Sequence, residues 1–226
     1  MFGILIVAPN FVRPYSDQKL KIMLSLSVII PENASAWCAD LAVFLRETKT
    51  DASIFFVGKI AEAFPECARE FSSNVDVGSE TYDYVDLVLL NNTSLQLEEV
   101  DRGKFAIDSV GNLRSQLFKA PFGSIDENIY SLLRISGVAA DFSYDDHYNV
   151  RVNERWIKYG CSSFNGAEHS SDFFMSLPVT KQPTVLKFNN TVPVSDIIEL
   201  VSQLQCRQDI EFVNASQVSG FSLTVR

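Results

Sequence analysis

The stretch from Ala52 to Leu87 reads ASIFFVGKIAEAFPECAREFSSNVDVGSETYDYVDL, and the rest of the chain is organised around it. Its first residues, Ala52 to Val57, form a continuous apolar run of the kind found in a strand covered on both faces. Gly58 turns the chain, and apolar side chains spaced as on one helical face predict a helix from Lys59 to Phe71. A second strand is predicted at Val75 to Val77. The stretch is therefore a strand, a helix and a strand.

Similar elements are predicted on both sides of this stretch. Lys21 to Ile30 alternates between apolar and polar residues, as a half-buried strand does, and Tyr144 to Ser176 is the least regular stretch. Ser35 and Ser195 are predicted to cap helices. Other strands are expected at 85–90, 138–142, 184–188 and 210–213, other helices at 36–47, 95–116, 126–136 and 195–206, and extended chain at 2–8, 118–121 and 221–225.

The alternation of strands with helices indicates βα units around a mostly parallel sheet. The closed form of such a sheet is a βα barrel, in which functional sites gather at the carboxyl ends of the strands. A length of 226 residues suits one sizeable core, and no linker or internal repeat divides the chain. We therefore expect a single domain over 1–226, with an N-terminal arm (1–20), a barrel (21–218) and a tail (219–226).

Composition narrows the classes of function. Hydrophobic residues make up 46% of the chain, which is typical of a globular protein. The net charge of -9 would repel a phosphate backbone, which argues against nucleic-acid binding. No apolar run approaches the length of a membrane span. Phe2 to Ala8 is short and apolar, and without a basic segment before it we interpret it as a strand or arm rather than as part of a signal peptide.

The cysteines and asparagines bear on location. The four cysteines, Cys38, Cys67, Cys161 and Cys206, form no C-x-x-C pair, so neither a zinc knuckle nor a thioredoxin-like site is indicated. Their even number is compatible with disulfides in an exported protein, and equally with buried free thiols. Asn-x-Ser/Thr acceptors occur at Asn33, Asn91, Asn92, Asn189 and Asn214. Together these features favour an extracellular, cell-surface or wall location.

Three segments carry a resemblance to a known family. Asp76-Val77-Gly78-Ser79, followed by Thr81-Tyr82 and Asp86-Leu87, resembles the segment that holds the metal-binding histidines of the polysaccharide deacetylase family (NodB homology domain, carbohydrate esterase family 4). FKAPFG, at 118–123, resembles that family's Arg-x-Pro-Tyr/Phe-Gly motif, and 184–218 resembles its last strand, helix and strand. The resemblance implies a distorted (β/α) barrel of the NodB type.

The family's chemistry needs particular residues. Its members remove acetyl groups from N-acetylglucosamine polymers with zinc or another divalent metal, which polarises the acetyl carbonyl and activates a bound water. In the family's Thr-Phe-Asp-Asp motif one aspartate is the base and the next binds the metal. An arginine pairs with an aspartate, two histidines complete the metal site, and a late histidine is the acid.

The resemblance assigns other residues to those positions in this chain. Ile29 and Ile30 stand at the two aspartates, and a slip of one residue, to Ile30 and Pro31, changes nothing. The other family positions are occupied by Glu80 and Tyr84 (metal histidines), Lys119 (arginine) and Phe188 (acid histidine, with Asn189 beside it). We therefore expect no metal and no catalytic residues here. The alternative is that another acidic pair, such as Asp145 and Asp146, serves instead.

These assignments give local expectations. The cleft would be lined by Glu80, Tyr82, Tyr84, Lys119 and Phe122. Glu80 and Lys119 would form an ion pair in place of the metal, or remain two solvated side chains. Cys38 and Cys206 lie on the first and last helices of the barrel pattern, so we hypothesise a disulfide between them. Aromatic residues near the cleft would stack on sugar rings or pack in the core: Trp37, Tyr82, Tyr84, Phe122, Tyr144 and Trp156.

The resemblance leaves three functions open. The first is a polysaccharide (chitin) deacetylase-like protein without catalysis, which binds a chitin-like or peptidoglycan-like glycan or has a structural role in a cell or spore wall. The resemblance extends to the chitin-deacetylase-like proteins of fungi and microsporidia, including spore-wall deacetylase homologues. The second is an active metal-dependent deacetylase with unusual site residues. The third is a protein-interaction scaffold that recognises no sugar.

Overall fold

A computed structural model describes residues 19–71, 73–111, 114–178 and 182–220. Its strands are β1 (Leu20–Val28), β2 (Ala52–Phe56), β3 (Val75–Ser79), β4 (Leu117–Phe118), β5 (Ala140–Asp141), β6 (His147–Val152), β7 (Arg155–Gly160), β8 (Ser162–Asn165), β9 (Thr184–Asn189) and β10 (Ile210–Val213). Its helices are α1 (Ala34–Thr48), α2 (Gly58–Ala63), α3 (Pro65–Arg69), α4 (Thr93–Gly111), the 3₁₀ turn η1 (Pro121–Gly123), α5 (Glu127–Ile135), α6 (Ser171–Met175), α7 (Val194–Gln205) and α8 (Ala215–Ser219). The expected arm and tail lie mostly outside the described residues.

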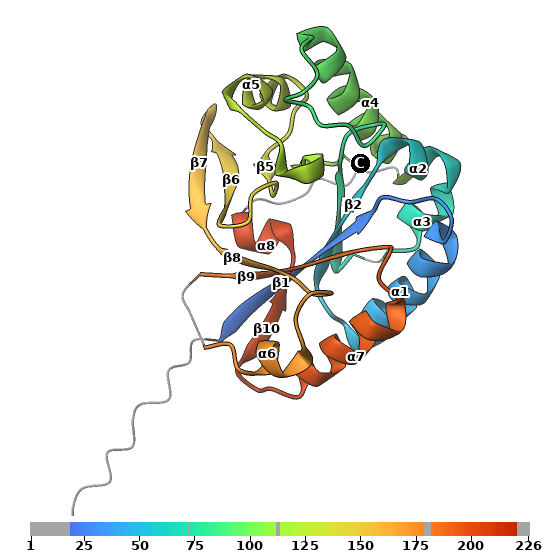
Figure 1. The fold of residues 1–226 in the computed structure, drawn as a ribbon, viewed down its shortest axis with the longest axis vertical. Helices are drawn as coiled ribbons and strands as arrows, with labels where there is room; N and C mark the ends of the chain where they lie inside the picture. Colours follow the sequence, from blue (N-terminus) through green and yellow to red (C-terminus); the bar gives the residue numbers. More distant parts are fainter. Residues whose placement is uncertain (1–18, 72, 112–113, 179–181, 221–226) are drawn as a thin grey trace, which may run out of the picture.

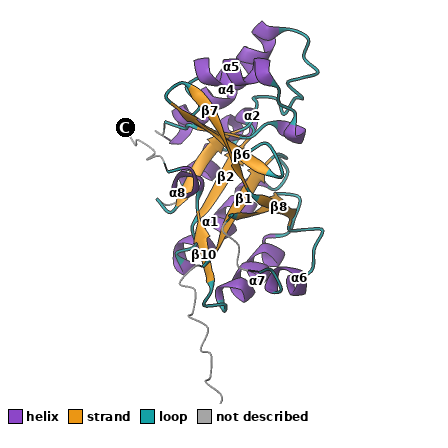
Figure 2. Ribbon diagram, turned by 90° about the vertical axis from the view of Figure 1, so that its left-hand side faces the viewer, coloured by secondary structure: helices purple, strands orange, loops and turns teal. Residues whose placement is uncertain are grey.

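The strands form one sheet in the order β7-β6-β5-β4-β3-β2-β1-β9-β8, with β10 also paired to β1. Neighbouring strands from β5 to β8 in this order pair in parallel, and so do β1 and β10. The pairs β5–β6 and β6–β7 are antiparallel. The sheet curls into a nearly closed barrel with helices around it (Figures 1 and 2). The predicted distorted, mostly parallel (β/α) barrel is confirmed.

Strand β1 is central because its two faces supply two cores. Alternate side chains from Leu20 to Val28 pack outward against α1 and α7, while Met23 joins Phe55 in a second cluster inside the barrel. Each fully buried large apolar side chain contributes about 1.5–3 kcal/mol, so this alternation fixes the register of β1. The same pleat directs Ser25 and Ser27 inward.

Local chemistry explains the places where the structure differs from the expected elements. The helix expected at 59–71 is divided at Phe64, where Pro65 begins α3. Residues 85–90 form a turn instead of a strand, because the Asp86 carboxylate accepts the backbone N–H groups of Val88 and Leu89. The stretch interpreted as irregular, 144–176, contains β6, β7, β8 and α6.

The predicted helix caps are also wrong. Helix α1 begins after Asn33 and α7 after Pro193, and neither residue caps its helix with a side-chain hydrogen bond. The Ser35 hydroxyl instead donates to the Glu66 carboxylate at 2.7 Å, which joins α1 to α3. Serine at a helix start therefore serves contact between helices here rather than capping.

The disulfide predicted between Cys38 and Cys206 is wrong. Cys38 pairs with Cys67 of α3, and their Cα atoms are 5.3 Å apart. Helix α1 does lie beside α7, but Cys38 is on the buried face of α1 that meets α3. Cys206 follows α7 as an exposed free thiol, and Cys161 is a buried free thiol. Within the described residues, no helix is long and apolar enough to cross a bilayer.

Candidate functional site

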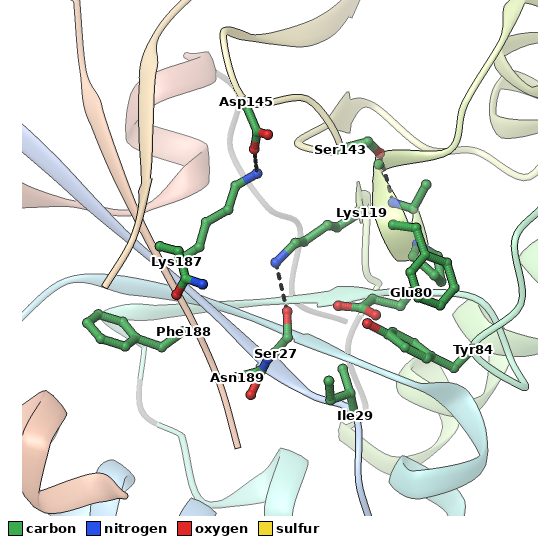
Figure 3. A pocket seen from close by; sticks show the side chains of 15 residues that line it. Ser27, Ile29, Glu80, Tyr84, Lys119, Ser143, Asp145, Lys187, Phe188 and Asn189 are labelled. Atoms are coloured by element: carbon green, nitrogen blue, oxygen red, sulfur yellow. Dashed lines mark hydrogen bonds and ion pairs between the residues drawn. The ribbon is translucent and has the colours of Figure 1, made fainter. Parts of the chain in front are cut away.

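A cavity of about 260 Å³ opens where the carboxyl ends of β1, β3, β4 and β9 converge. These strands or the residues directly after them bring Ser27, Glu80, Lys119 and Phe188 to its wall (Figure 3). Parallel strands place their carboxyl ends at one edge, which is where sites form in barrels of this kind. The cavity is therefore the candidate functional site.

A serine and a lysine form the hydrogen bond at the centre of this cavity. The Lys119 ammonium donates to the Ser27 hydroxyl oxygen at 2.8 Å. Ser27 is held in β1, between β2 and β9, and the Lys119 backbone N–H donates to the Ser79 carbonyl at 3.1 Å. Rigid strands thus fix both partners. The sequence did not point to Ser27, because the resemblance placed the nearby Ile29 and Ile30 at the positions of the family's two aspartates.

Glu80 is a buried carboxylate with an unused acceptor. It is 2% exposed, and its Oε2 atom has no hydrogen-bond partner. Burial raises the pKa of Glu80 to about 7, and the nearby Lys119 ammonium and Ser27 hydroxyl limit the rise. Gly103 of α4 packs closely against the backbone of Glu80: a Cβ atom at Gly103 would lie 2.5 Å from the Glu80 carbonyl oxygen. The close packing of α4 therefore keeps Glu80 at the cavity.

The predicted Glu80–Lys119 ion pair is not formed. The Lys119 ammonium bonds to Ser27, and the two charged side chains influence each other without direct contact. Burial lowers the pKa of Lys119 to about 8; Glu80 opposes this shift, Lys187 adds to it and Asp145 opposes it. The prediction of two solvated side chains is wrong as well, since Glu80 is buried and the half-buried Lys119 has its ammonium bonded to Ser27. Burial rather than pairing dominates the electrostatics of the site.

Two aromatic residues form one rim of the cavity. Tyr84 and Phe122 line it with ring centroids 5.2 Å apart, and Phe122 is 71% exposed. Both have a backbone φ of 59°, which is uncommon for residues other than glycine. Such a conformation costs on the order of 1–3 kcal/mol and is typical of functional sites. Burial raises the pKa of Tyr84 to about 12, so its hydroxyl stays protonated near neutral pH.

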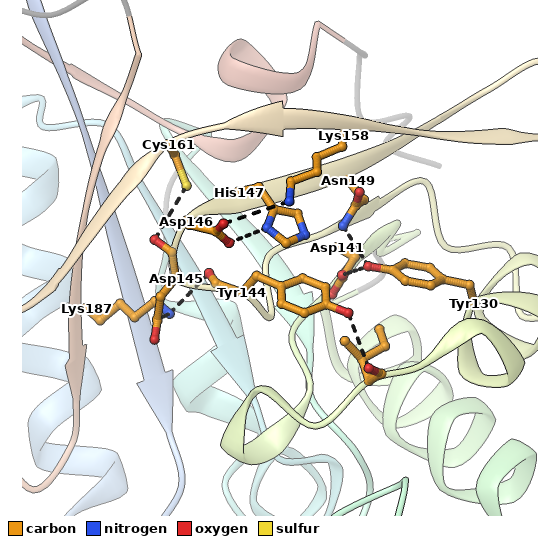
Figure 4. A network of polar contacts seen from close by, with 11 residues as sticks. Tyr130, Asp141, Tyr144, Asp145, Asp146, His147, Asn149, Lys158, Cys161 and Lys187 are labelled. Carbon is orange, nitrogen blue, oxygen red and sulfur yellow. Dashed lines mark hydrogen bonds and ion pairs between the residues drawn. The ribbon is translucent and has the colours of Figure 1, made fainter.

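Lys187 and Asp145 form the opposite rim. The Lys187 ammonium makes an ion pair with the Asp145 carboxylate and donates to the Tyr144 carbonyl at 3.4 Å (Figure 4). Asp146 instead contacts the ring of His147. The two adjacent aspartates therefore contact different side chains and do not form the alternative catalytic pair.

A buried polar network supports the segment after Lys119. The Tyr130 hydroxyl donates to the Asp141 carboxylate at 2.7 Å (Figure 4), and the Ser143 hydroxyl also bonds to Asp141. Ser143 accepts the backbone N–H of Ala120 at 2.7 Å. Burial raises the pKa of Asp141, and its hydroxyl donors oppose that rise. Because Ala120 follows Lys119 directly, this network orients the lysine.

Several predicted residues lie elsewhere. Ile29 lines the cavity, but Ile30 and Tyr82 do not. The backbone N–H groups of Ile29 and Ile30 both donate to Asn190 Oδ1, at 2.9 and 3.1 Å. The Tyr82 hydroxyl donates to Glu62 at 2.8 Å, and the Arg102 guanidinium lies 3.7 Å from the centroid of its ring. Trp37, Tyr144 and Trp156 are likewise absent from the cavity wall.

Phe188 separates this cavity from a second one. The second cavity has a volume of about 510 Å³ and is lined by Gly166, His169, Thr191 and Glu199, among others. Phe188 lines both cavities, and a Cβ at Gly166 would collide with its ring. The absence of a side chain at Gly166 therefore allows the ring to occupy this place.

The donor set of the first cavity does not fit a divalent metal ion. Glu80 faces the Lys119 cation, and Asp145 is already paired with Lys187. Among the described residues, no group of three or more His, Cys, Asp or Glu side chains is placed to hold an ion. Hard divalent cations are bound by several oxygen ligands, and zinc by about four ligands in most sites.

The fold and site define a (β/α) barrel protein with a polar cavity at the carboxyl ends of its strands. The polysaccharide deacetylase family model matches residues 29–140. The chain belongs to the polysaccharide deacetylase family. No curated protein matches its sequence.

Solved structures share the fold at low sequence identity. BA3943 from Bacillus anthracis, described as a CE4 family pseudoenzyme, is 11% identical with a TM-score of 0.66, over 89% of this chain and 66% of that one. Peptidoglycan deacetylase PdaC from Bacillus subtilis is 17% identical with a TM-score of 0.65, over 90% and 91%. A putative polysaccharide deacetylase from Mycobacterium smegmatis is 15% identical with a TM-score of 0.70, over 91% of both chains.

Proposed function

We propose that this protein lacks the metal-dependent deacetylase activity of its family and binds a glycan in the cavity at the barrel mouth. The observation that carries the proposal is the half-buried Lys119, whose ammonium is bonded to Ser27 where the family would place carboxylates and a metal. A cation here would repel a divalent ion. The same proposal places Ile29, Glu80, Tyr84 and Phe188 at positions where the family has its other metal-binding and catalytic residues.

Ser27 fits one of these positions better than Ile29 or Ile30 does. In the family, the arginine that corresponds to Lys119 pairs with an aspartate. Because Lys119 bonds to Ser27, we infer that Ser27 takes the place of that aspartate. A hydroxyl can accept a hydrogen bond from the lysine but cannot supply the charge that a metal site needs.

Metal content and acetate release test the loss of activity. Purified protein is dialysed against zinc, cobalt or manganese, its bound metal is quantified, and acetate is measured after incubation with N-acetylglucosamine oligomers. We expect no stoichiometric metal and no acetate. Stoichiometric metal together with turnover would instead establish an active deacetylase with unusual site residues.

The exposed aromatic rim supports glycan binding. Phe122 and Tyr84 offer apolar ring surface beside hydrogen-bonding groups, the combination that sugar rings require. Calorimetric titration with chitin oligomers and peptidoglycan fragments tests this directly. Phe122→Ala should weaken binding about 5- to 10-fold, which corresponds to about 1 kcal/mol for one aromatic contact. Phe105→Ala is the matched control, since Phe105 is 69% exposed on α4, away from the cavity.

The titrations also separate glycan binding from a scaffold role. If every glycan gives a flat titration while the protein remains folded, glycan binding is rejected and an interaction scaffold becomes the better description. Equal weakening by Phe122→Ala and Phe105→Ala would place the glycan outside the cavity.

An exported location, at a cell surface or wall, belongs to the same proposal. The Cys38–Cys67 disulfide supports it, since such bonds persist in oxidising compartments. Among the glycosylation acceptors, Asn91 and Asn92 are exposed, whereas Asn214 is buried. Fractionation of the source cells, followed by detection of the protein in wall and cytoplasmic fractions, tests it. Recovery of reduced protein from the cytoplasm alone would count against it.

A further inference from the structure

The pair formed by Ser27 and Lys119 has a geometry that a silent glycan-binding cavity does not require. Nζ and Oγ are 2.8 Å apart on the wall of an open cavity, where Ser27 is buried in β1 and Lys119, which directly follows β4, is half-buried. We propose that Ser27 and Lys119 form a serine–lysine nucleophile and base that takes the acyl group from a small activated ester without a metal. This reactivity is independent of the metal-dependent reaction whose loss is proposed above.

A serine hydroxyl becomes a useful nucleophile only when an adjacent base takes its proton. A lysine serves as that base when burial makes its neutral amine accessible. The charged groups that face Lys119 are Glu80 from the segment after β3, Lys187 from β9 and Asp145 from the segment after β5. Burial outweighs them and lowers the pKa of Lys119 to about 8, so a useful fraction of amine exists in mild base.

The proposed step balances within the residues of the cavity. The neutral Lys119 amine removes the Ser27 proton as Ser27 Oγ forms a bond to the acyl carbon. The resulting Lys119 ammonium lies next to the tetrahedral oxyanion and stabilises it. The bond from the acyl carbon to the leaving-group oxygen then breaks, the leaving group departs as its anion or takes that proton, and the acyl group remains as an ester of Ser27. Water later hydrolyses this ester and restores the hydroxyl.

Tyr84 provides a second source of stabilisation. It lines the same cavity and retains its proton, since its pKa is raised to about 12. Its phenol is therefore available as a neutral hydrogen-bond donor to developing negative charge. The cavity of about 260 Å³ lies just below the usual range for ligand pockets, which suits a short acyl chain.

Glu80 should tune the reaction without touching the acyl group. Its negative charge favours the ammonium form of Lys119. Replacing it with neutral glutamine should therefore lower the pH at which Lys119 becomes neutral. A purely structural role for Glu80 would change the amount of folded protein, but it would not move this midpoint.

The test uses the full chain with p-nitrophenyl acetate in the presence of a chelator. We expect a burst of p-nitrophenolate close to one equivalent of protein, a mass increase of one acetyl group, and peptide mapping that localises the acetyl group to Ser27. The burst rate should rise with pH through about 8. Ser27→Ala should abolish it, and Lys119→Arg should slow it by about 100-fold or more, the usual contribution of a general base.

Matched controls make the result decisive. Ser195→Ala and Lys59→Arg alter an exposed serine and an exposed lysine, and both should retain the full burst. Glu80→Gln should shift the pH midpoint downward. The proposal is overturned if the acetyl group maps to other residues, if no burst appears, or if Ser27→Ala reacts like wild type. Mapping on wild-type protein needs no variant to fold, and glycan titrations test the binding role separately.

Discussion

Removing the Cys38–Cys67 bond should destabilise the protein by an amount that the chain itself sets. The two cysteines are 29 residues apart in sequence, and the bond joins α1 to α3 across β2 and α2. Closing a loop of that length removes about 12 cal/mol/K of entropy from the unfolded chain, which is about 3.6 kcal/mol at 25 °C. For a protein of this size, that loss corresponds to a fall in Tm of roughly 7–14 °C.

The perturbation is the double substitution Cys38→Ala/Cys67→Ala, measured by urea denaturation and thermal unfolding. Both cysteines are fully buried, so the loss of two sulfur atoms adds a small cavity cost to the entropic one. Cys206→Ala is the control, because Cys206 is an exposed free thiol, and it should stay within about 0.5 kcal/mol of wild type.

Two results would refute this reasoning. The first is a double variant whose free energy of unfolding falls by less than about 1 kcal/mol, well below the value from loop closure. The second is a peptide map of unreduced protein in which Cys38 is joined to Cys206 or carries a free thiol. Treatment of unfolded wild-type protein with a thiol reagent, before and after reduction, gives an independent count of paired cysteines.

Three further predictions concern the barrel mouth. The pKa of Glu80 is raised from 4.5 to about 7 in the folded state, so stability present below pH 4.5 is lost as pH rises through about 7. Urea titrations across this range should therefore show wild type losing stability relative to Glu80→Gln, and parallel curves would contradict this. Asn190→Ala should lower the free energy of unfolding by about 3 kcal/mol in a denaturant titration, because it leaves two backbone N–H groups unpaired. The control Asn91→Ala alters an exposed asparagine and should lower it by less than about 0.5 kcal/mol. Equal losses would refute this role for Asn190. Phe122→Gly should stabilise the protein by about 1 kcal/mol by relieving a positive φ, and Phe105→Gly within α4 should destabilise it by a similar amount; a Tm shift of the same sign in both would oppose the strain argument.

The barrel was predictable where a single periodicity determines the structure. In β1, one face is apolar and the other carries Ser25 and Ser27, so the strand and its two cores follow from alternation. The same information failed at 85–90, where an apolar run is overridden by the Asp86 carboxylate accepting nearby backbone N–H groups. The hairpin β6–β7 was missed because its turn residues, Asn153 and Glu154, adopt positive φ without the usual glycine.

The candidate site was predicted in part. Ile29, Glu80, Tyr84, Lys119, Phe122 and Phe188 do come together at one cavity. The roles of Lys187 and Asp145 could not be found, since their pairing joins residues 42 positions apart in sequence. The Cys38–Cys67 bond was missed for a similar reason, because the contact of α1 with α3 depends on how helices pack around the sheet. Motif spacing also gave no reason to single out Ser27.

The ring of Phe188 stands between two cavities. Its removal would let a larger molecule fit into the combined space. The spaces on either side of it measure about 260 and 510 Å³. A single small side chain at this position would join the two chambers into one trough leading from the barrel mouth toward α7. The length of the open space is therefore limited by one bulky residue, and a lineage could alter it in one mutational step while the strands that hold the site stay unchanged.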